Sequence, residues 1–244
     1  MLNPFALFLA APYAEALFLL LTFAAIEAAD RRRYILAGIW GALAAYTRML
    51  GLVVLGLIVL EGAWHWMEER AQGRPLGRLS VRILAGAALV TLGFGAYLLL
   101  NIQLSGEPFT FMRYQAQNWS QRFGSLWYTA KTTGMQMLHD IGDPYLLGTW
   151  LPQCVAMLVV PAMLVVCHKR IPVSWAAYAW VYILVALAPT WLLSGPRYLM
   201  ALAVLPVLQA SISNRRWFHM AFFTVQGLLA LLYAYLYGVV RYVL

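Results

Sequence analysis

Ionisable side chains stand beside the long apolar stretches of this chain, and three of them bear on its chemistry: Glu15, Arg48 and Arg197. Because an ionisable group is costly to place in a membrane, such residues mark sites or pathways by default. Arginines can hold phosphate oxygens through paired hydrogen bonds, and a carboxylate can take a proton from an acceptor hydroxyl. This combination suits an enzyme that acts on a lipid-anchored phosphate, although simple interfacial anchoring is the alternative.

Two of these charges also have a purely structural interpretation. Glu15 can complement the dipole at the start of an apolar helix, and Arg197 can extend to lipid head groups. Arg48 is harder to explain in this way, because we expect it at the tip of a helical hairpin. It therefore favours a role in a site.

The segment from Gly106 to Gly124 interleaves amide, aromatic and guanidinium side chains. Amides such as Gln115 can bond sugar hydroxyls, and rings such as Trp119 can stack on the apolar face of a sugar. The same pattern is typical of a helix that lies in the membrane interface. Both interpretations stay open from the residues alone.

The composition excludes a water-soluble globule. Of the 244 residues, 63% are hydrophobic and 11% are charged, whereas soluble domains contain about 45–50% apolar and 25% charged residues. The mean hydropathy is +0.73. In so apolar a chain, the net charge of +8 indicates the orientation signal of a membrane protein rather than a nucleic-acid footprint.

Neither a disulfide nor a metal site is expected. Cys154 and Cys167 lie in one apolar stretch, about 20 Å apart if it is helical, which is beyond disulfide reach. The four histidines form no pair at helical spacing and have no nearby carboxylate cluster, so a metal centre has little support. The first residues also lack the basic region of a removable signal peptide.

Six apolar stretches approach the roughly 20 residues that a membrane-spanning helix needs. A seventh, residues 34–66, would be about 50 Å long as one helix, against a hydrocarbon core of about 30 Å. Arginines flank it on both sides, and since positive loops stay cytoplasmic, we expect a helical hairpin with its tip at residues 46–51. The six stretches are Ala14–Ala29, Ile83–Leu104, Leu146–Cys167, Val173–Leu193, Tyr198–Ile212 and Trp217–Val240.

These stretches predict an all-α, polytopic membrane helical bundle of about eight helices, six full spans and the hairpin, in a single transmembrane domain over residues 1–244. Successive loops lie on alternating sides of the membrane, and the basic loops are cytoplasmic. A long loop, residues 105–145, is therefore expected on the external side. Irregular backbone at the hairpin tip is tolerated only where protein buries it or where it lines a cavity. The tip is therefore expected to face a site.

Several blocks of this sequence resemble the PIG-V family of membrane glycosyltransferases and its bacterial relatives, which have a GT-C type of fold. NPFALFLAAPYAE, from Asn3 to Glu15, is similar to the family's P-x-x-x-F and A-P-Y-[ST]-E block, and LAGIWGALAAYTRMLGL, from Leu36 to Leu52, to its A-[TL]-T-R-x-x-G-L block. The loop GEPFTFMRYQAQNW and the stretch PRYLMALAVLP are similar to later family segments. Taken together, the resemblance extends over most of the chain.

This resemblance implies an inverting glycosyltransferase, with mannose as the expected sugar, that uses a polyprenyl-phosphate-linked donor on the non-cytoplasmic face. The acceptor is a lipid-linked or other molecule, and no cofactor or metal is implied. The expected partners are the lipid-linked sugar donor and membrane lipids, not nucleic acid. By position, eight residues fall on the family's patterned positions: Tyr13, Glu15, Thr47, Arg48, Gln115, Trp119, Arg197 and Tyr198. We expect all of them except Glu15 to bind substrate. Glu15 is then the only well-placed carboxylate left for an acid/base role.

The resemblance also places further family segments ahead of the block that begins at Asn3. There the family has its first spans and an external loop with the acidic residue usually assigned as general base, so we expect this chain to lack them. An incomplete gene product, a misassigned start and a relative that no longer catalyses are the alternatives. A lipid-linked sugar transporter or flippase and a catalytically incomplete membrane subunit are the alternatives to an enzyme.

The composition, rich in Ala, Leu and Arg, favours a bacterial plasma membrane over the endoplasmic reticulum.

Overall fold

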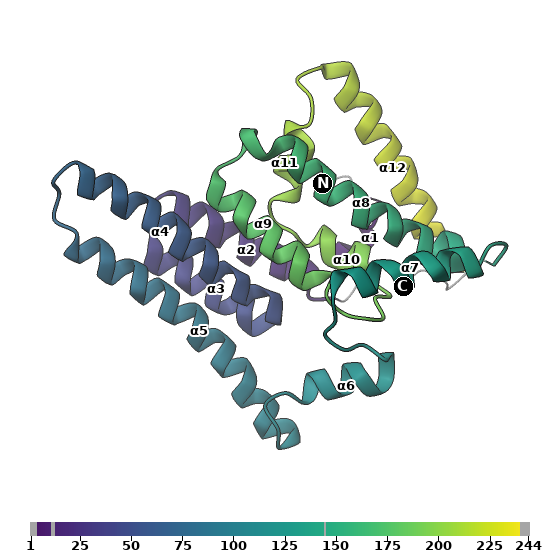
Figure 1. The fold of residues 1–244 in the computed structure, drawn as a ribbon, viewed down its shortest axis with the longest axis horizontal. Coiled ribbons are helices and arrows are strands. Elements are labelled where there is room, and N and C mark those ends of the chain that lie inside the picture. Colours follow the sequence, from purple (N-terminus) through teal and green to yellow (C-terminus); the bar gives the residue numbers. More distant parts are fainter. Residues whose placement is uncertain (1–3, 11–12, 144, 240–244) are drawn as a thin grey trace. The chain divides into compact units, whose positions relative to one another are not determined.

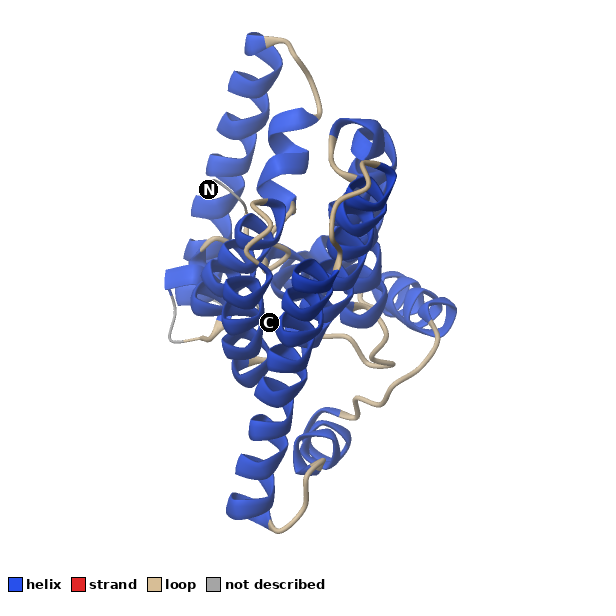
Figure 2. Ribbon diagram, turned by 90° about the vertical axis from the view of Figure 1, so that its left-hand side faces the viewer, coloured by secondary structure: helices blue, strands red, loops and turns tan. Residues whose placement is uncertain are grey.

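Helices make up the regular structure of the computed structural model, which describes residues 4–10, 13–143 and 145–239 (Figures 1 and 2). Within these ranges there is no β-strand, only an isolated antiparallel bridge between Phe123 and Pro189. The predicted all-α class is confirmed. Asn3, Pro12 and Val240, which belong to predicted segments, lie outside the described residues.

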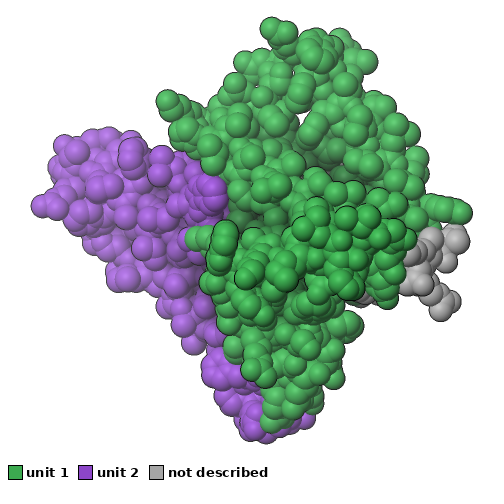
Figure 3. Space-filling view, turned by 45° about the vertical axis from the view of Figure 1, so that its right-hand side comes forward, with its two compact units in different colours: residues 1–16, 112–171, 183–244 green, residues 17–111, 172–182 purple. Residues whose placement is uncertain are grey.

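The chain divides into two compact units, which Figure 3 shows in green and purple. Unit 1 comprises residues 1–16, 112–171 and 183–244, and unit 2 comprises residues 17–111 and 172–182. The single transmembrane domain expected from the sequence stays a prediction.

Unit 2 holds most of the helices from the first half of the chain (Figure 1). A 3-10 turn, Met49–Leu52, joins two of them. They are the greater part of α2 (Glu15–Asp30), then α3 (Tyr34–Thr47), α4 (Val53–Ala71) and α5 (Gly77–Ser105).

The predicted hairpin has its turn at Arg48. This residue ends α3 because its backbone is extended, with φ −152° and ψ 141°. The Tyr34 hydroxyl donates to the Glu61 carbonyl over 3.4 Å, so the start of α3 lies beside the middle of α4. Gly41, nearer the end of α3, lies against Val54 at the start of α4. The two helices are therefore antiparallel, with Arg48 in the turn as expected.

Glycines allow α3 and α5 to approach closely. A Cβ atom on Gly38 would lie 2.5 Å from the Gly86 carbonyl oxygen, and one on Gly86 would lie 2.3 Å from that of Tyr34. Further along, a Cβ atom on Gly93 would lie 2.3 Å from the Ala42 carbonyl oxygen. The contacts follow the same order on both helices, which makes them parallel. Such small-residue interfaces are typical of helices that pack within membranes.

Unit 1 is organised around α8 (Leu151–Cys167), which packs against α7, α10 and α11. A second contact joins α1 to α12, where Phe5, Phe8 and Met200 form a buried cluster with Tyr233 and Leu236. The remaining helices have these bounds: α1 Leu7–Ala10, α6 Thr110–Trp119, α7 Leu126–His139, α9 Val173–Ala186, α10 Gly195–Met200, α11 Leu205–Ser211 and α12 Arg216–Val239.

An irregular segment, residues 187–194, leads from α9 to α10 and is fixed by hydrogen bonds. The Gly124 N–H donates to the Ala188 carbonyl over 3.0 Å, and the Thr190 N–H donates to the Arg122 carbonyl over 2.8 Å. On α7, the Thr129 hydroxyl donates to the Pro189 carbonyl over 2.9 Å. These bonds fix the position of the segment that leads into α10.

The buried side chain of Gln153, on α8, joins α7 to the start of α10. Its Nε2 donates to Thr133 Oγ1 over 3.0 Å, and its Oε1 accepts from the Gly195 N–H over 3.3 Å. Since the first N–H groups of a helix have no partner within that helix, Gln153 satisfies one of those of α10. A Cβ atom on Gly195 would lie only 2.9 Å from Leu192 Cδ2, so this start has no room for a side chain.

The six full spans expected from the sequence are not confirmed. One expected span, Tyr198–Ile212, is divided into α10 and α11. Pro206 at the start of α11 explains the division, because proline favours the first turn of a helix and disrupts its interior. Another, Val173–Leu193, is helical only to Ala186. Within the described ranges, four helical segments are long and apolar enough to cross a membrane: Met49–Ala71, Gly77–Ser105, Leu146–Arg170 and Arg216–Gly238.

Replacing Gly86 with alanine tests the close packing of α3 and α5. The new methyl group would overlap backbone atoms of Tyr34, so we expect a loss of about 1–3 kcal/mol in stability. Gly95 lies on the same helix with open space around it, and Gly95→Ala should leave stability unchanged or raise it slightly through helix propensity. Thermal unfolding of both variants in the same detergent measures the difference, and equal melting temperatures would refute the packing.

Replacing Gln153 with leucine tests the link between α7, α8 and α10. The variant leaves the Gly195 N–H without its partner, which costs about 1–3 kcal/mol for a buried donor. Thr133→Val breaks the other half of the link and serves as the second arm of a double-mutant cycle. We expect the two losses in thermal stability to be clearly non-additive. Simple additivity would show that the two hydrogen bonds do not form one unit.

Candidate functional site

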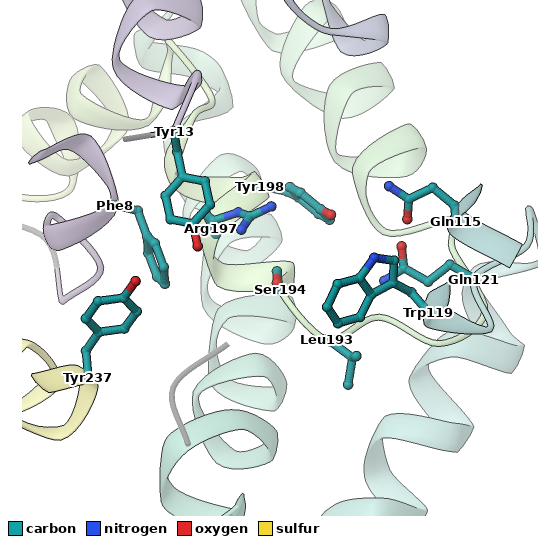
Figure 4. Close-up of a pocket in the computed structure, with 10 residues that line it drawn as sticks. All are labelled: Phe8, Tyr13, Gln115, Trp119, Gln121, Leu193, Ser194, Arg197, Tyr198 and Tyr237. Carbon is teal, nitrogen blue, oxygen red and sulfur yellow. The ribbon is translucent and has the colours of Figure 1, made fainter. Parts of the chain in front are cut away.

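A cavity of about 620 Å³ lies in unit 1, within the range of about 300–1,000 Å³ that is usual for small-molecule sites. Five residues predicted from the sequence line it: Tyr13, Gln115, Trp119, Arg197 and Tyr198. They come from three separate parts of the chain, which unit 1 brings together. The full lining, shown in Figure 4, is Phe8, Tyr13, Gln115, Trp119, Gln121, Leu193, Ser194, Arg197, Tyr198 and Tyr237.

Arg197 is the charged residue of this lining, and Glu15 is its ion-pair partner. Arg197 Nε lies 3.0 Å from Glu15 Oε1; the Glu15 side chain is 2% exposed and that of Arg197 is 19% exposed. Coulomb attraction is strong where solvent is excluded. Removing one partner of such a pair leaves an uncompensated buried charge. The pair therefore links the first turn of α2 to α10.

Aromatic rings surround the Arg197 guanidinium. Its Cζ atom lies 4.7 Å from the ring centre of Tyr13, 5.3 Å from that of Tyr198 and 5.8 Å from that of Phe8. All three distances fall within the roughly 6 Å over which a cation is attracted to a ring face. In Figure 4 the guanidinium lies among these side chains at the wall of the cavity. A guanidinium held in this way can accept a phosphate or carboxylate ligand.

Two amides and an indole form the other side of the cavity. Gln115 and Trp119 lie on α6, and Gln121 follows this helix after one residue. The Gln121 N–H donates to the Gln115 carbonyl over 3.1 Å and holds the chain against the helix end. Figure 4 shows the three side chains gathered on one side. Amides and a ring without a charged group suit a neutral, polar ligand portion.

Thr47 and Arg48 lie in unit 2, and their membership of this site stays a prediction. The Thr47 hydroxyl donates to the Leu43 carbonyl over 2.7 Å. The Arg48 Cζ atom lies 5.9 Å from the ring centre of Phe18. Both residues stand at the break between α3 and α4, as the sequence predicted.

Half of the lining was not identified from the sequence. Phe8 belongs to the block that carries the family resemblance, and Gln121 extends the run of amides and aromatics by two positions past Trp119. The sequence pattern could therefore have predicted both residues as members of the site. Leu193 and Tyr237 lie in apolar surroundings, where nothing in the sequence separates a lining residue from a core residue.

Asp140, at the end of α7, lies outside the cavity lining, in the loop that the sequence predicts to be external. It forms hydrogen bonds with His139 Nδ1 over 2.9 Å and with Trp150 Nε1 over 2.6 Å. These two bonds, that of His139 first, lower the pKa of the Asp140 carboxyl below its ordinary value. Trp150 also packs edge-on against Trp191, so Asp140 belongs to the support of the segment that precedes α10.

No arrangement suitable for a metal ion is present in the part of the chain that the structure describes. Within it, no three or more His, Cys, Asp and Glu side chains form a group that could hold one. The cavity lining presents a guanidinium, amides, hydroxyls and rings.

Comparison with known proteins finds a family match for the first part of the chain. Residues 1–111 match the family described as Mannosyltransferase (PIG-V). Over 99 residues, or 39% of this chain, the sequence is 34% identical to GPI alpha-1,6-mannosyltransferase 2 of Mus musculus. The matched segment spans 20% of the mouse protein. No solved structure matches the chain.

The family match contains Tyr13, Glu15, Thr47 and Arg48, whereas the other predicted site residues lie beyond it. The resemblance that the sequence analysis extends over most of the chain is therefore confirmed for residues 1–111 alone. The apolar helices and the family match together indicate an integral membrane protein. The comparisons thus show that the first 111 residues are similar to the mannosyltransferase (PIG-V) family.

Proposed function

We propose that this chain is a membrane glycosyltransferase that moves mannose or a related sugar from a polyprenyl-phosphate-linked donor to a lipid-linked or other acceptor. The proposed location is the non-cytoplasmic face of a bacterial plasma membrane. One observation carries the proposal: Arg197, paired with Glu15 and enclosed by rings, lies at a cavity whose other side holds amides and an indole. Such a cavity suits a ligand that is anionic at one end and rich in hydroxyls at the other.

Arg197 is proposed to hold the phosphate of the donor. As the bond between sugar and phosphate breaks, negative charge builds on the phosphate oxygens, and a fixed guanidinium stabilises that charge. The ion pair with Glu15 and the ring of Tyr13 hold Arg197 before the ligand arrives. Little reorganisation is then needed during the reaction.

Gln115 and Trp119 are proposed to hold the sugar. An amide both donates and accepts hydrogen bonds, as a sugar hydroxyl does. The Trp119 side chain is half exposed at the cavity, which leaves a ring face available for the apolar side of a sugar. Tyr198 lines the cavity beside Arg197 and is assigned to the same ligand.

Glu15 supports the proposal first as the partner of Arg197. Its Oε1 atom is engaged with Arg197 Nε, and Glu15 is not among the cavity-lining residues. A role as general base would require Glu15 to leave this ion pair and meet the acceptor hydroxyl. The acid/base role therefore stays a prediction, and the geometry supports a positioning role.

Thr47 and Arg48 enter the proposal through the family resemblance. They lie in the matched residues, at the turn of the hairpin. We assign them to the donor as well, with Arg48 as a second cation for the phosphate. The assignment is a prediction from sequence position.

The test is the transfer of labelled sugar from a polyprenyl-phosphate hexose to acceptor lipid in proteoliposomes. Arg197→Ala should lower the rate of transfer by about 100-fold or more, the usual cost of removing a fixed group that stabilises developing charge. Arg197→Lys should recover only part of the activity, because lysine cannot form the paired hydrogen bonds of a guanidinium. Each variant is compared at equal levels of inserted protein.

Arg216→Ala is the matched control, because Arg216 is exposed at the start of α12 and does not line the cavity. It should transfer sugar at the rate of the original chain. Undiminished transfer by Arg197→Ala would contradict the assignment. Movement of the lipid-linked sugar across the vesicle membrane, without formation of a glycosidic bond, would favour the transporter alternative.

A further inference from the structure

Gln121 is a largely buried residue whose amide side chain has no role in the proposed function so far. Gln121 is 8% exposed and lines the cavity. Among the described residues its side chain has no hydrogen-bond partner; the one bond formed by Gln121 is that of its backbone N–H to the Gln115 carbonyl. Because the amide lines the cavity and makes no hydrogen bond to the described protein, its donor and acceptor are available to a ligand there.

The backbone before Gln121 is held in an unusual conformation. Ser120 has a φ of +51°, in the left-handed region that residues other than glycine seldom adopt. This turn directly follows the end of α6, a place where glycine is the common choice. It brings Trp119 and Gln121, on either side of Ser120, to the same cavity. Strained backbone of this kind concentrates at functional sites.

The chemistry around Gln121 defines the portion of ligand that it meets. Gln115 supplies a second amide and Trp119 a ring, and all three lie together in Figure 4. Arg197 is the charged member of the lining and belongs to the other group of side chains. An uncharged group with neighbouring donors and acceptors, such as the hydroxyls of a sugar, therefore fits the Gln121 side.

We propose that Gln121 is a specificity-determining residue, whose amide hydrogen bonds to hydroxyl groups of the transferred sugar and whose placement is set by the left-handed backbone of Ser120. The proposal rests on the proposed function and deepens it, because it assigns sugar recognition to one residue. It also separates that recognition from phosphate binding at Arg197.

The experiment measures binding by the full chain in lipid nanodiscs, with two probes. One is a polyprenyl phosphate that carries mannose, and the other is the same polyprenyl phosphate without sugar. Gln121→Leu removes the amide with little change in size. Gln117→Leu is the matched control, since Gln117 lies on α6, is exposed and does not line the cavity.

For Gln121→Leu we expect the Kd of the mannosylated probe to rise about tenfold, which corresponds to about 1.4 kcal/mol. The Kd of the probe without sugar should not change, and Gln117→Leu should bind both probes as the original chain does. Wild-type affinity of Gln121→Leu for the mannosylated probe would overturn the proposal. An equal loss for both probes, or the same loss in Gln117→Leu, would overturn it as well.

Two Ser120 variants test the backbone part of the proposal. Ser120→Gly adopts the left-handed conformation without strain, so it should retain the affinity for the mannosylated probe. Ser120→Val resists that conformation and should lose affinity for this probe while keeping it for the probe without sugar. Lower affinity of Ser120→Gly than of Ser120→Val for the mannosylated probe would overturn the role of Ser120.

Failure of the proposed function gives a different result. If the original chain transfers no sugar, but Gln121→Leu loses affinity for the mannosylated probe alone, the proposed glycosyltransferase activity is overturned and the role of Gln121 in sugar binding is supported. If the original chain transfers sugar and Gln121→Leu binds and transfers equally well, the role of Gln121 is overturned and the proposed function stands.

Discussion

The ion pair between Glu15 and Arg197 joins the start of the chain to its last third. Glu15 is almost completely buried, and its Oε1 atom lies 3.0 Å from Arg197 Nε. A buried carboxylate is tolerated only with such a partner, so the position of each residue depends on the other. The structure supports the pair from the side of α10, where Gln153 accepts a hydrogen bond from Gly195, and from the side of the N-terminal block, where Tyr13 covers the guanidinium.

The cavity separates two kinds of chemistry. Arg197 supplies positive charge among aromatic rings, and Gln115, Trp119 and Gln121 supply neutral hydrogen-bonding groups and a ring. A sugar linked to a lipid phosphate has the same division, with its charge at the phosphate and its hydroxyls on the sugar. The match between the two is the physical basis of the proposed function, and the similarity of residues 1–111 to the mannosyltransferase (PIG-V) family agrees with it.

The sequence predicted the features that depend on charge and on apolar length. Flanking arginines and an over-long apolar stretch predict the hairpin, and its turn falls at Arg48. Tyr198–Ile212 was expected to span the membrane because hydropathy takes no account of Pro206, which begins a new helix. The sequence did not predict the hydrogen bonds of Gln153, since the position of a polar residue in an apolar stretch does not indicate which groups it bonds. The φ of Ser120 is a property of the folded chain and could not be derived from residue type.

The most direct test of the account is photoaffinity labelling of the full chain in lipid vesicles, with a polyprenyl-phosphate mannose that carries a diazirine on the sugar. Mass spectrometry of the labelled peptides locates the bound sugar. The account predicts labels in the segment that carries Gln115, Trp119 and Gln121, and competition by unlabelled polyprenyl-phosphate mannose. Labels confined to α3, α4 and α5, with none in unit 1, would contradict it.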